Sequence, residues 1–296
     1  MERNLNIGLI DVDSHNYPNL ALMKISAYEK AQGNSVEWWN GLKHYDRVYQ
    51  AKVFDDTYSQ DNEFAINADE IIKGGTGYNL DGRLPDEIEH IYPDYRLYGI
   101  TDTAYGFLTR GCPRHCKFCI VGDKEGLISH KVADLSEFWH GQKNIEILDP
   151  NLLACSKRSE LLDELAESGG CVNFNQGLDV RLLDRDCAEQ INHIKTSMIH
   201  FAWDNYEFNT RKCLERAREW IDKDFYHVRV YVLTNFNTTL EQDYERVITI
   251  RSIGFDPFVM IYDKPHAPKG VRELQRWCNN KRIFRSCDFC DYNPNI

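Results

Sequence analysis

The sequence lacks any long apolar run and has fewer basic than acidic side chains. No stretch approaches the ~20 apolar residues that a membrane-spanning helix needs, and residues 1–6 contain no apolar signal core. The 35 Lys and Arg residues are outnumbered by 46 Asp and Glu, which gives a formal net charge of −11. An acidic chain is a poor general binder of phosphate backbones. We therefore expect a cytoplasmic protein with no membrane partner, for which nucleic acid is a disfavoured partner.

Cysteine is absent from the first 111 residues, although the chain contains ten cysteines. In a cytoplasmic protein, cysteines in this number suggest metal or redox chemistry rather than disulfides. The length of 296 residues and a hydrophobic content of 42% allow one large domain or two smaller ones with real cores.

The first cysteines form a compact motif. Cys112, Cys116 and Cys119 follow an apolar run at residues 105–108 in a Cys-x3-Cys-x2-Cys spacing. Soft thiolates favour iron–sulfur clusters or zinc, and either site normally has four ligands. A [4Fe–4S] cluster on three thiolates leaves one iron open to a substrate or cofactor. Zinc sites usually pair two distant Cys-x2–4-Cys units, and ferredoxins use other spacings with a fourth cysteine.

This motif, with Phe118 just before the last cysteine, resembles the signature of the radical S-adenosylmethionine (radical SAM) superfamily. The resemblance implies a [4Fe–4S] cluster on Cys112, Cys116 and Cys119, whose open iron binds SAM. It implies reductive cleavage of SAM to a 5′-deoxyadenosyl radical that modifies a substrate. It also implies a one-electron reductant such as flavodoxin or ferredoxin as a partner. The substrate and the catalytic residues stay unassigned.

The first eighty residues alternate strand and helix patterns, which predicts a parallel α/β sheet. A helix is expected at residues 18–32, with Leu20, Met23, Ala27 and Ala31 on its apolar face. Strands are expected at residues 6–12, 35–39, 47–54 and 69–73. The glycines at residues 74–77 would let the backbone approach a ligand or a neighbouring strand.

This region resembles the Rossmann-like cobalamin-binding domain of many radical SAM proteins. Asp13, His15 and Pro18 match the Asp-x-His-x-x-Gly motif, whose histidine can bind cobalt, except that proline replaces glycine. Gly74 and Gly75 lie where the second glycine motif is expected, but the Ser-x-Leu motif is absent around residues 50–52. The resemblance therefore implies cobalamin as a cofactor of a degenerate domain, and the alternative is a strand-to-helix loop whose polar residues cap the helix.

Six strand–helix units are expected from residue 100 onward. The first strand lies in 100–110, and later strands are expected at residues 144–148, 171–174, 198–202, 228–234 and 257–262. Helices are expected between them at residues 134–140, 157–167, 184–193, 207–222 and 239–253. This alternation gives parallel strands with helical crossovers, and the resemblance implies a partial (β/α)6 TIM-like barrel. We predict an α/β protein with a Rossmann-like domain (residues 1–80), a linker (81–99), the barrel (100–265) and a C-terminal tail (266–296).

Polar residues follow several of these strands. The resemblance implies that Asp149 accepts hydrogen bonds from the amino group of SAM, although it is equally suited to a turn. Gln176, Asp179 and Arg181 match a Gln-x-x-Asp-x-Arg stretch that faces the carboxylate and ribose of SAM in the family. Arg181 suits a carboxylate because its planar guanidinium donates two parallel hydrogen bonds, and a surface ion pair is the alternative. Asn235 follows the fifth strand, where the family binds adenine.

The tail contains Cys278, Cys287 and Cys290, the last two as a Cys-x2-Cys pair. Such a group predicts a second cluster or a zinc site, and surface thiols are the alternative. Cations and aromatic residues surround it: Arg272, Arg276, Trp277, Lys281, Arg282, Phe284 and Arg285. The rival hypothesis is therefore a non-catalytic zinc protein that contacts nucleic acid through this basic segment.

Overall fold

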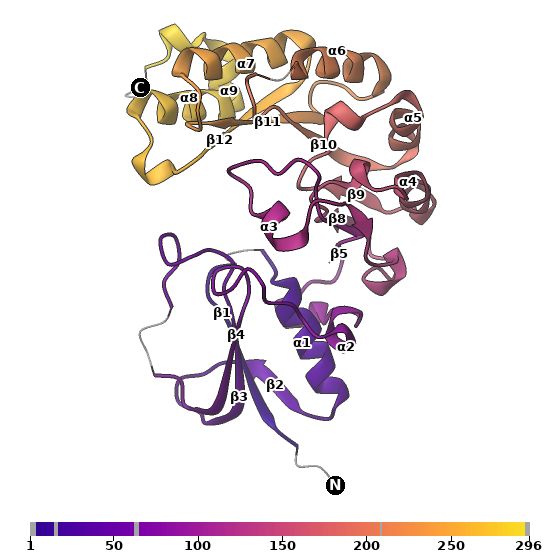
Figure 1. Ribbon diagram of the computed structural model, residues 1–296, viewed down its shortest axis with the longest axis vertical. Helices are drawn as coiled ribbons and strands as arrows, with labels where there is room; N and C mark the ends of the chain where they lie inside the picture. The colour runs from indigo at the N-terminus through magenta and orange to yellow at the C-terminus, as the bar shows by residue number, and fades with distance from the viewer. Residues whose placement is uncertain (1–3, 15–16, 62–64, 208, 294–296) are drawn as a thin grey trace. The chain divides into compact units, whose positions relative to one another are not determined.

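The computed structural model describes residues 4–14, 17–61, 65–207 and 209–293 (Figure 1). The chain forms two compact units, each with its own core. The first unit comprises Met1–Gly106 and Ala133–Lys143, and the second comprises Phe107–Val132 and Asn144–Ile296. The architecture is α/β with parallel sheets, as the alternation of strand and helix patterns predicted.

The first unit contains a four-stranded sheet in the order β2-β1-β3-β4, in which every neighbouring pair is parallel. Register pairs Ile7 with Arg47 and Val48 with Ile71. The chain begins in the centre of the sheet and runs first to one edge and then to the other. The strands are β1 (Asn6–Asp11), β2 (Ser35–Trp38), β3 (Tyr45–Ala51) and β4 (Ala68–Gly74).

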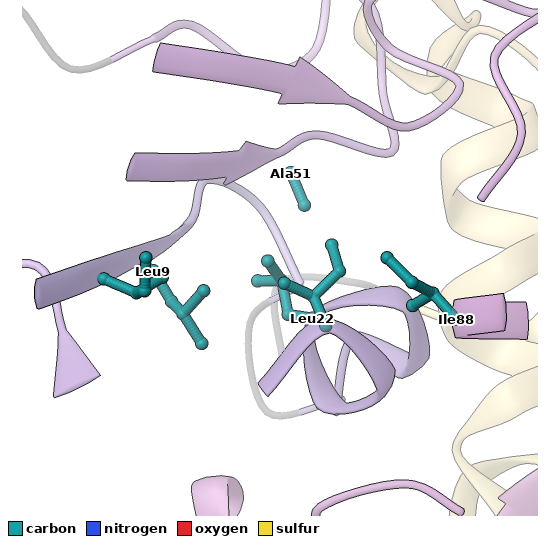
Figure 2. Packing of buried hydrophobic residues seen from close by; sticks show 6 residues of the cluster. Leu9, Leu22, Ala51 and Ile88 are labelled. Carbon is teal, nitrogen blue, oxygen red and sulfur yellow. The ribbon is translucent and has the colours of Figure 1, made fainter. Parts of the chain in front are cut away.

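Helix α1 (Leu20–Ala31) begins at Asn19, whose side chain accepts a hydrogen bond from the Leu22 N–H at 3.2 Å. Its buried residues are Leu22, Met23, Ile25, Ser26 and Glu29, so only Met23 of the expected apolar face is buried. Leu22 packs among Leu9, Ala51 and Ile88 in the core on one face of the sheet (Figure 2).

Residues 81–99, predicted as a linker, are part of the first unit. They contain α2 (Asp86–Glu89) and the 3₁₀ turn η1 (Tyr95–Tyr98). Ile88 is 6% exposed within the core, and Asp94 accepts a hydrogen bond from the Ser26 hydroxyl at 2.7 Å. The linker prediction missed the buried apolar side chains of this stretch because the sequence around them is rich in proline, glycine and acidic residues.

The second unit contributes β8 to β12 to a sheet in the order β12-β11-β10-β9-β8-β5. The pairs from β8 to β12 are parallel, and the strands follow one another in sequence order. Right-handed crossovers between strands in this order place the connecting helices on one side of the sheet, as α4 to α7 lie in Figure 1. The strands are β5 (Thr103–Gly106), β8 (Asn144–Ile147), β9 (Cys171–Phe174), β10 (Thr196–Ala202), β11 (Val228–Thr234) and β12 (Asp256–Ile261).

The helices of the second unit are α3 (Val121–Glu125), α4 (Arg158–Ser168), α5 (Arg185–His193), α6 (Thr210–Trp220), α7 (Leu240–Ile253), α8 (Lys269–Asn279) and α9 (Lys281–Ser286). Helices α4 to α7 match predicted ones within a few residues, whereas α3, α8 and α9 have no predicted counterpart. The helix expected at residues 134–140 is a single 3₁₀ turn, η2 (Leu135–Glu137), which belongs to the first unit. In the part of the chain that the structure describes, no helix is both long and apolar enough to cross a membrane.

Candidate functional site

The three cysteines of the central motif lie on a loop that a two-stranded ribbon closes. β6 (Thr109–Arg110) leads into the loop and pairs antiparallel with β7 (His130–Lys131), which leads out of it. Gly111 follows β6 with a φ of +86°, and a Cβ there would lie 2.2 Å from the carbonyl oxygen of Ile128. Only glycine permits this approach, so Gly111 fixes the start of the cysteine segment.

Asp149, at the carboxyl end of β8, holds the strand that enters the loop. It is 4% exposed, and its carboxylate accepts hydrogen bonds from the N–H groups of Leu108 at 2.7 Å and Thr109 at 2.9 Å. The Thr109 hydroxyl donates a third at 2.7 Å. Burial raises the pKa of Asp149 to about 7, although these hydrogen bonds oppose the shift. Asp149 was predicted to face the amino group of SAM, and the structure places it as a support of the cysteine loop.

The thiols of Cys112, Cys116 and Cys119 are free, partly buried and close enough to interact electrostatically. Burial raises the pKa of Cys116, and the nearby charge of Cys119 raises it further. Burial likewise raises the pKa of Cys119, to which the charge of Cys112 adds. Three thiolates this close repel one another, and a bound cationic centre would remove that repulsion.

Asn151 links the cysteine loop to the strand ends, a role that the sequence did not reveal. Its Nδ2 group lies 3.4 Å from the Cys112 sulfur and 3.4 Å from a carboxylate oxygen of Asp179. Asn151 is 3% exposed, and its Oδ1 atom is buried without a hydrogen-bond partner among the described residues. An unsatisfied buried acceptor is costly, so Oδ1 is available to a donor on a bound molecule.

Asp179 follows β9 and joins two arginines. Its carboxylate accepts hydrogen bonds from the Arg114 Nε–H at 2.6 Å and from Arg181 at 2.7 and 3.1 Å. Burial would raise the pKa of Asp179, but Arg181 and Arg114 hold it below its ordinary value. Arg114 lies within the cysteine loop, so this network attaches the loop to the carboxyl end of β9.

Asp204, at the carboxyl end of β10, is the second acid near the thiols. Burial raises its pKa to about 6, and the Leu233 N–H donates to its Oδ1 atom at 3.2 Å. Its charge acts on the thiols of Cys116 and Cys119. Within the described ranges no cation forms an ion pair with Asp204, so this carboxyl is well placed for a donor group of a bound molecule.

Arg246 of α7 holds the ends of β10 and β11 together. It is fully buried and donates hydrogen bonds to the carbonyl oxygens of Trp203 at 2.6 Å and Leu233 at 2.8 Å. Its charge is balanced by Asp243, one turn earlier on α7, at 2.5 Å. The pair fixes the backbone beside Asp204.

Aromatic rings connect the cysteine loop to the last two strands. Phe118 packs edge-on against Phe236, with 5.3 Å between ring centroids, and Phe236 packs against Tyr262 at 4.9 Å. Asn235 adopts a left-handed φ of +63°, and its side-chain amide donates to the Tyr262 carbonyl at 2.8 Å. The carboxyl ends of β11 and β12 therefore meet Phe118 through Phe236.

The remaining predicted residues lie apart from this group. Gln176 is exposed. Cys278 is fully buried on α8, where its thiol donates to the Pro257 carbonyl at 3.4 Å. Cys287 instead lies 3.8 Å from the Ile283 carbonyl, and Cys290 is exposed.

Two cations of the tail are engaged with the protein itself. Lys281 pairs with Asp256 at 2.7 Å, and the guanidinium of Arg285 lies 4.6 Å from the centre of the Tyr226 ring. Trp277 and Phe284 are buried, so both aromatic residues belong to the core of the second unit. Lys281 and Arg285 are therefore engaged within the protein, and Trp277 and Phe284 are buried. The rival hypothesis of a nucleic-acid surface loses these two cations and two aromatic rings.

The cysteine loop offers three free thiols but does not bring them together around a single metal position. Among the residues that the structure describes, no three His, Cys, Asp or Glu side chains converge on a position for one metal ion. A tetrahedral ion with metal–sulfur bonds of ~2.3 Å would need sulfurs about 3.8 Å apart. A cluster binds each thiolate to a different iron and tolerates wider separations. Three neighbouring thiols are a suitable donor set for it.

The described residues around Asp13 and Gly75, predicted to bind cobalamin, are engaged with the first unit's own backbone. Asp13 is 8% exposed, and its carboxylate accepts hydrogen bonds from the N–H groups of Val53 at 2.9 Å and Phe54 at 2.8 Å. A Cβ on Gly75 would lie 2.2 Å from the Lys52 carbonyl oxygen, so the glycine motif serves the approach of a neighbouring strand. His15, the predicted cobalt ligand, lies outside the described residues.

The chain's own side chains also fill the carboxyl end of β3. Lys52 is 1% exposed, and its ammonium pairs with Asp56 at 2.5 Å and Asp61 at 3.2 Å. The same ammonium lies 4.5 Å from the centre of the Tyr78 ring. The described residues at this edge therefore do not fit cobalamin.

Comparison with known proteins adds no relative to this picture: no protein-family model matches the chain, and no curated protein matches it.

Proposed function

We propose that the second unit is a radical SAM enzyme, which binds a [4Fe–4S] cluster through Cys112, Cys116 and Cys119. One observation carries the proposal: side chains from the carboxyl ends of successive parallel strands all interact with the cysteine loop. Asn151 after β8, Asp179 after β9 and Phe236 after β11 contact residues of the loop, and the charge of Asp204 after β10 acts on its thiols. Reactive groups gather at this end of parallel strands in enzymes with strand–helix repeats.

The fold supports the same proposal. Six strands in sequence order, with helices on one side, are the arrangement of an open (β/α)6 barrel. We propose that the sheet from β5 to β12 is such a partial barrel, with the cysteine loop after its first strand.

The chain's own residues have separable roles in this proposal. The cluster, when bound, would supply the electron that cleaves SAM to methionine and a 5′-deoxyadenosyl radical, after reduction by a flavodoxin or ferredoxin. Asp149 fixes the entrance of the loop, and Asp179 fixes Arg114 and Arg181 beside it. Asn151 Oδ1 and the Asp204 carboxyl are acceptors suited to N–H or O–H groups of SAM.

The test is anaerobic purification followed by measurement of iron, sulfide, visible absorption and 5′-deoxyadenosine after addition of SAM and dithionite. We expect a [4Fe–4S] spectrum and deoxyadenosine from the natural chain, and loss of both in Cys116→Ala. Cys213→Ala is the matched control, because Cys213 lies on α6, where its sulfur accepts a hydrogen bond from Arg216. A colourless protein that binds zinc, or unchanged deoxyadenosine formation in Cys116→Ala, would refute the proposal.

A further inference from the structure

A cavity of about 330 Å³ opens at the carboxyl end of β1 in the first unit. All of its lining residues belong to the first unit, and they include Asp11 at the end of β1, Tyr17, Pro18, Tyr98, Ile100 and Tyr105. The neighbours of β1 are β2 on one side and β3 on the other, so the chain order reverses at this strand. In open parallel sheets, ligands bind outside the carboxyl ends of the strands at such a reversal point.

The cavity contains a negative charge that has no positive partner in the described part of the chain. Asp11 accepts hydrogen bonds from the Tyr98 hydroxyl at 2.5 Å and from the Ser14 N–H at 3.1 Å, and both donors are neutral. Burial and the hydrogen bond to Asp11 raise the pKa of Tyr98, so its hydroxyl stays protonated. Among the described residues, the lining includes no Lys, Arg or His. A partly buried carboxylate in this setting is stabilised by a cationic ligand.

The walls of the cavity are aromatic and held in place. Tyr17 and Tyr105 stand nearly perpendicular, with ring centroids 5.4 Å apart and an interplanar angle of 82°. Tyr98 is supported from outside the lining by Trp38, at 5.0 Å and 79°. The Tyr105 N–H donates to the buried Tyr95 hydroxyl at 3.0 Å, which fixes the third ring. The faces of such rings attract cations.

We propose that this cavity binds a small organic cation with a methylated ammonium group. Three tyrosines and one carboxylate line the cavity, which is the composition of the aromatic cages that recognise quaternary ammonium ligands. A fully methylated, quaternary ammonium has no N–H group and needs no hydrogen-bond acceptor, whereas a primary ammonium carries three N–H donors to satisfy. The net charge of −11 further favours the approach of a cation. The site goes beyond the proposed radical SAM activity and shares no residue with the cysteine loop.

The first test is isothermal titration calorimetry of the intact chain with choline and with 3,3-dimethylbutan-1-ol. The alcohol has nearly the shape of choline but carries carbon in place of the charged nitrogen. We expect saturable binding of choline, competition by tetramethylammonium, and at least about tenfold weaker binding of the alcohol. Equal binding of the two compounds, or no saturable binding of choline, would overturn the proposal.

The second test uses variants of the cavity. Asp11→Asn removes the charge, and Tyr17→Leu removes one ring that is 39% exposed and therefore tolerates change. We expect each to weaken choline binding about tenfold or more, whereas Tyr17→Phe should retain it within about threefold because the ring face remains. Asp55→Asn is the matched control, since this exposed acid lies outside the cavity lining. Unchanged binding in Tyr17→Leu, with an unchanged circular dichroism spectrum, would contradict the cage.

Discussion

The two units both contain parallel strands but use the carboxyl ends of those strands differently. In the first unit, the end of β3 is filled by Lys52 and its acidic partners, and Gly75 packs against the Lys52 backbone. In the second unit, the strand ends present Asn151, Asp179 and other side chains to an inserted loop that carries three thiols. Strand direction alone therefore does not make a site. At the end of β3 the side chains pair with one another, whereas at the ends of β8 and β9 they contact the cysteine loop.

The largest predicted effect concerns the buried pair of α7. Asp243→Ala leaves the Arg246 guanidinium buried without its counter-charge, so we expect the free energy of unfolding to fall by about 3–5 kcal/mol. Urea denaturation gives the magnitude, and hydrogen exchange should increase in β10 and β11 of the second unit. Glu245→Ala on the exposed face of α7 removes only a hydrogen bond from Tyr206 and should cost less than about 1 kcal/mol. Equal effects of the two variants would show that the pair does not hold the strand ends.

The second prediction tests how tightly the strand ends of the first unit are closed. Gly75→Ala combines a φ of +100° with a Cβ 2.2 Å from a carbonyl oxygen, so we expect a loss of about 3 kcal/mol. Gly33→Ala is the matched control, because Gly33 has a φ of +86° but a Cβ added there would meet no atom within 4 Å among the described residues. It should cost only about 1 kcal/mol. Similar denaturation midpoints for both variants would mean that the backbone approach at Gly75 is not tight.

The third prediction concerns pH and the second unit. The pKa of Asp149 is raised to about 7 in the folded chain. Between pH ~4 and 7 this carboxyl group is therefore protonated in a larger fraction of folded molecules than of unfolded ones. The contribution of Asp149 to stability is therefore greatest at low pH and is lost as the pH rises through 7. We expect the stability of the natural chain, relative to Asp149→Asn, to fall by about 2 kcal/mol from pH 5 to pH 8. A difference that is constant with pH would contradict the shift.

The smallest predicted effect is a second pH dependence of stability, opposite in sign, which arises from His200 in the second unit. His200 of β10 is 5% exposed and stacks on Tyr231 at 5.0 Å, and burial lowers its pKa to about 4. Below pH ~6.5 the His200 imidazole is protonated in the unfolded chain but stays neutral in the folded chain. The free energy of unfolding therefore falls as the pH falls. We expect the stability of the natural chain relative to His200→Phe to drop by about 1–2 kcal/mol between pH 7.5 and pH 5. The same stability difference between the natural chain and His200→Phe at both pH values would contradict the lowered pKa of His200.

The order of strands and helices could be predicted from the sequence because hydrophobic periodicity changes at each boundary. The strands at residues 171–174 and 228–234 were placed with their observed bounds. The predicted linker at 81–99 was wrong because a few buried residues such as Ile88 do not form a periodic pattern. The apolar face of α1 was also misplaced. Ser26, which donates a hydrogen bond to Asp94, and Glu29, which accepts one from the Tyr49 hydroxyl, are buried because of these bonds rather than through hydrophobicity.

The site was only partly readable for a related reason. Residue type and spacing singled out Cys112, Cys116 and Cys119, which stay a predicted cluster site. The pairing of Asp179 with Arg181 could be predicted because they are two residues apart. Asp149 could not be assigned, because its partners are backbone N–H groups 40 and 41 residues away. Asn151 was missed because its contact with Cys112 spans 39 residues. Contacts between distant strand ends depend on the fold, which no local pattern encodes.

The interleaving of the two units along the chain also has a practical consequence for anyone who divides this protein. The first unit is completed only by Ala133–Lys143, whose Phe138 carbonyl accepts a hydrogen bond from Tyr95 at 2.7 Å and whose Phe138 ring packs on Gly106. A fragment that stops at residue 106 would expose that surface and aggregate or be degraded. On the ribosome, the first unit must wait until the cysteine loop has been synthesised before it can finish folding.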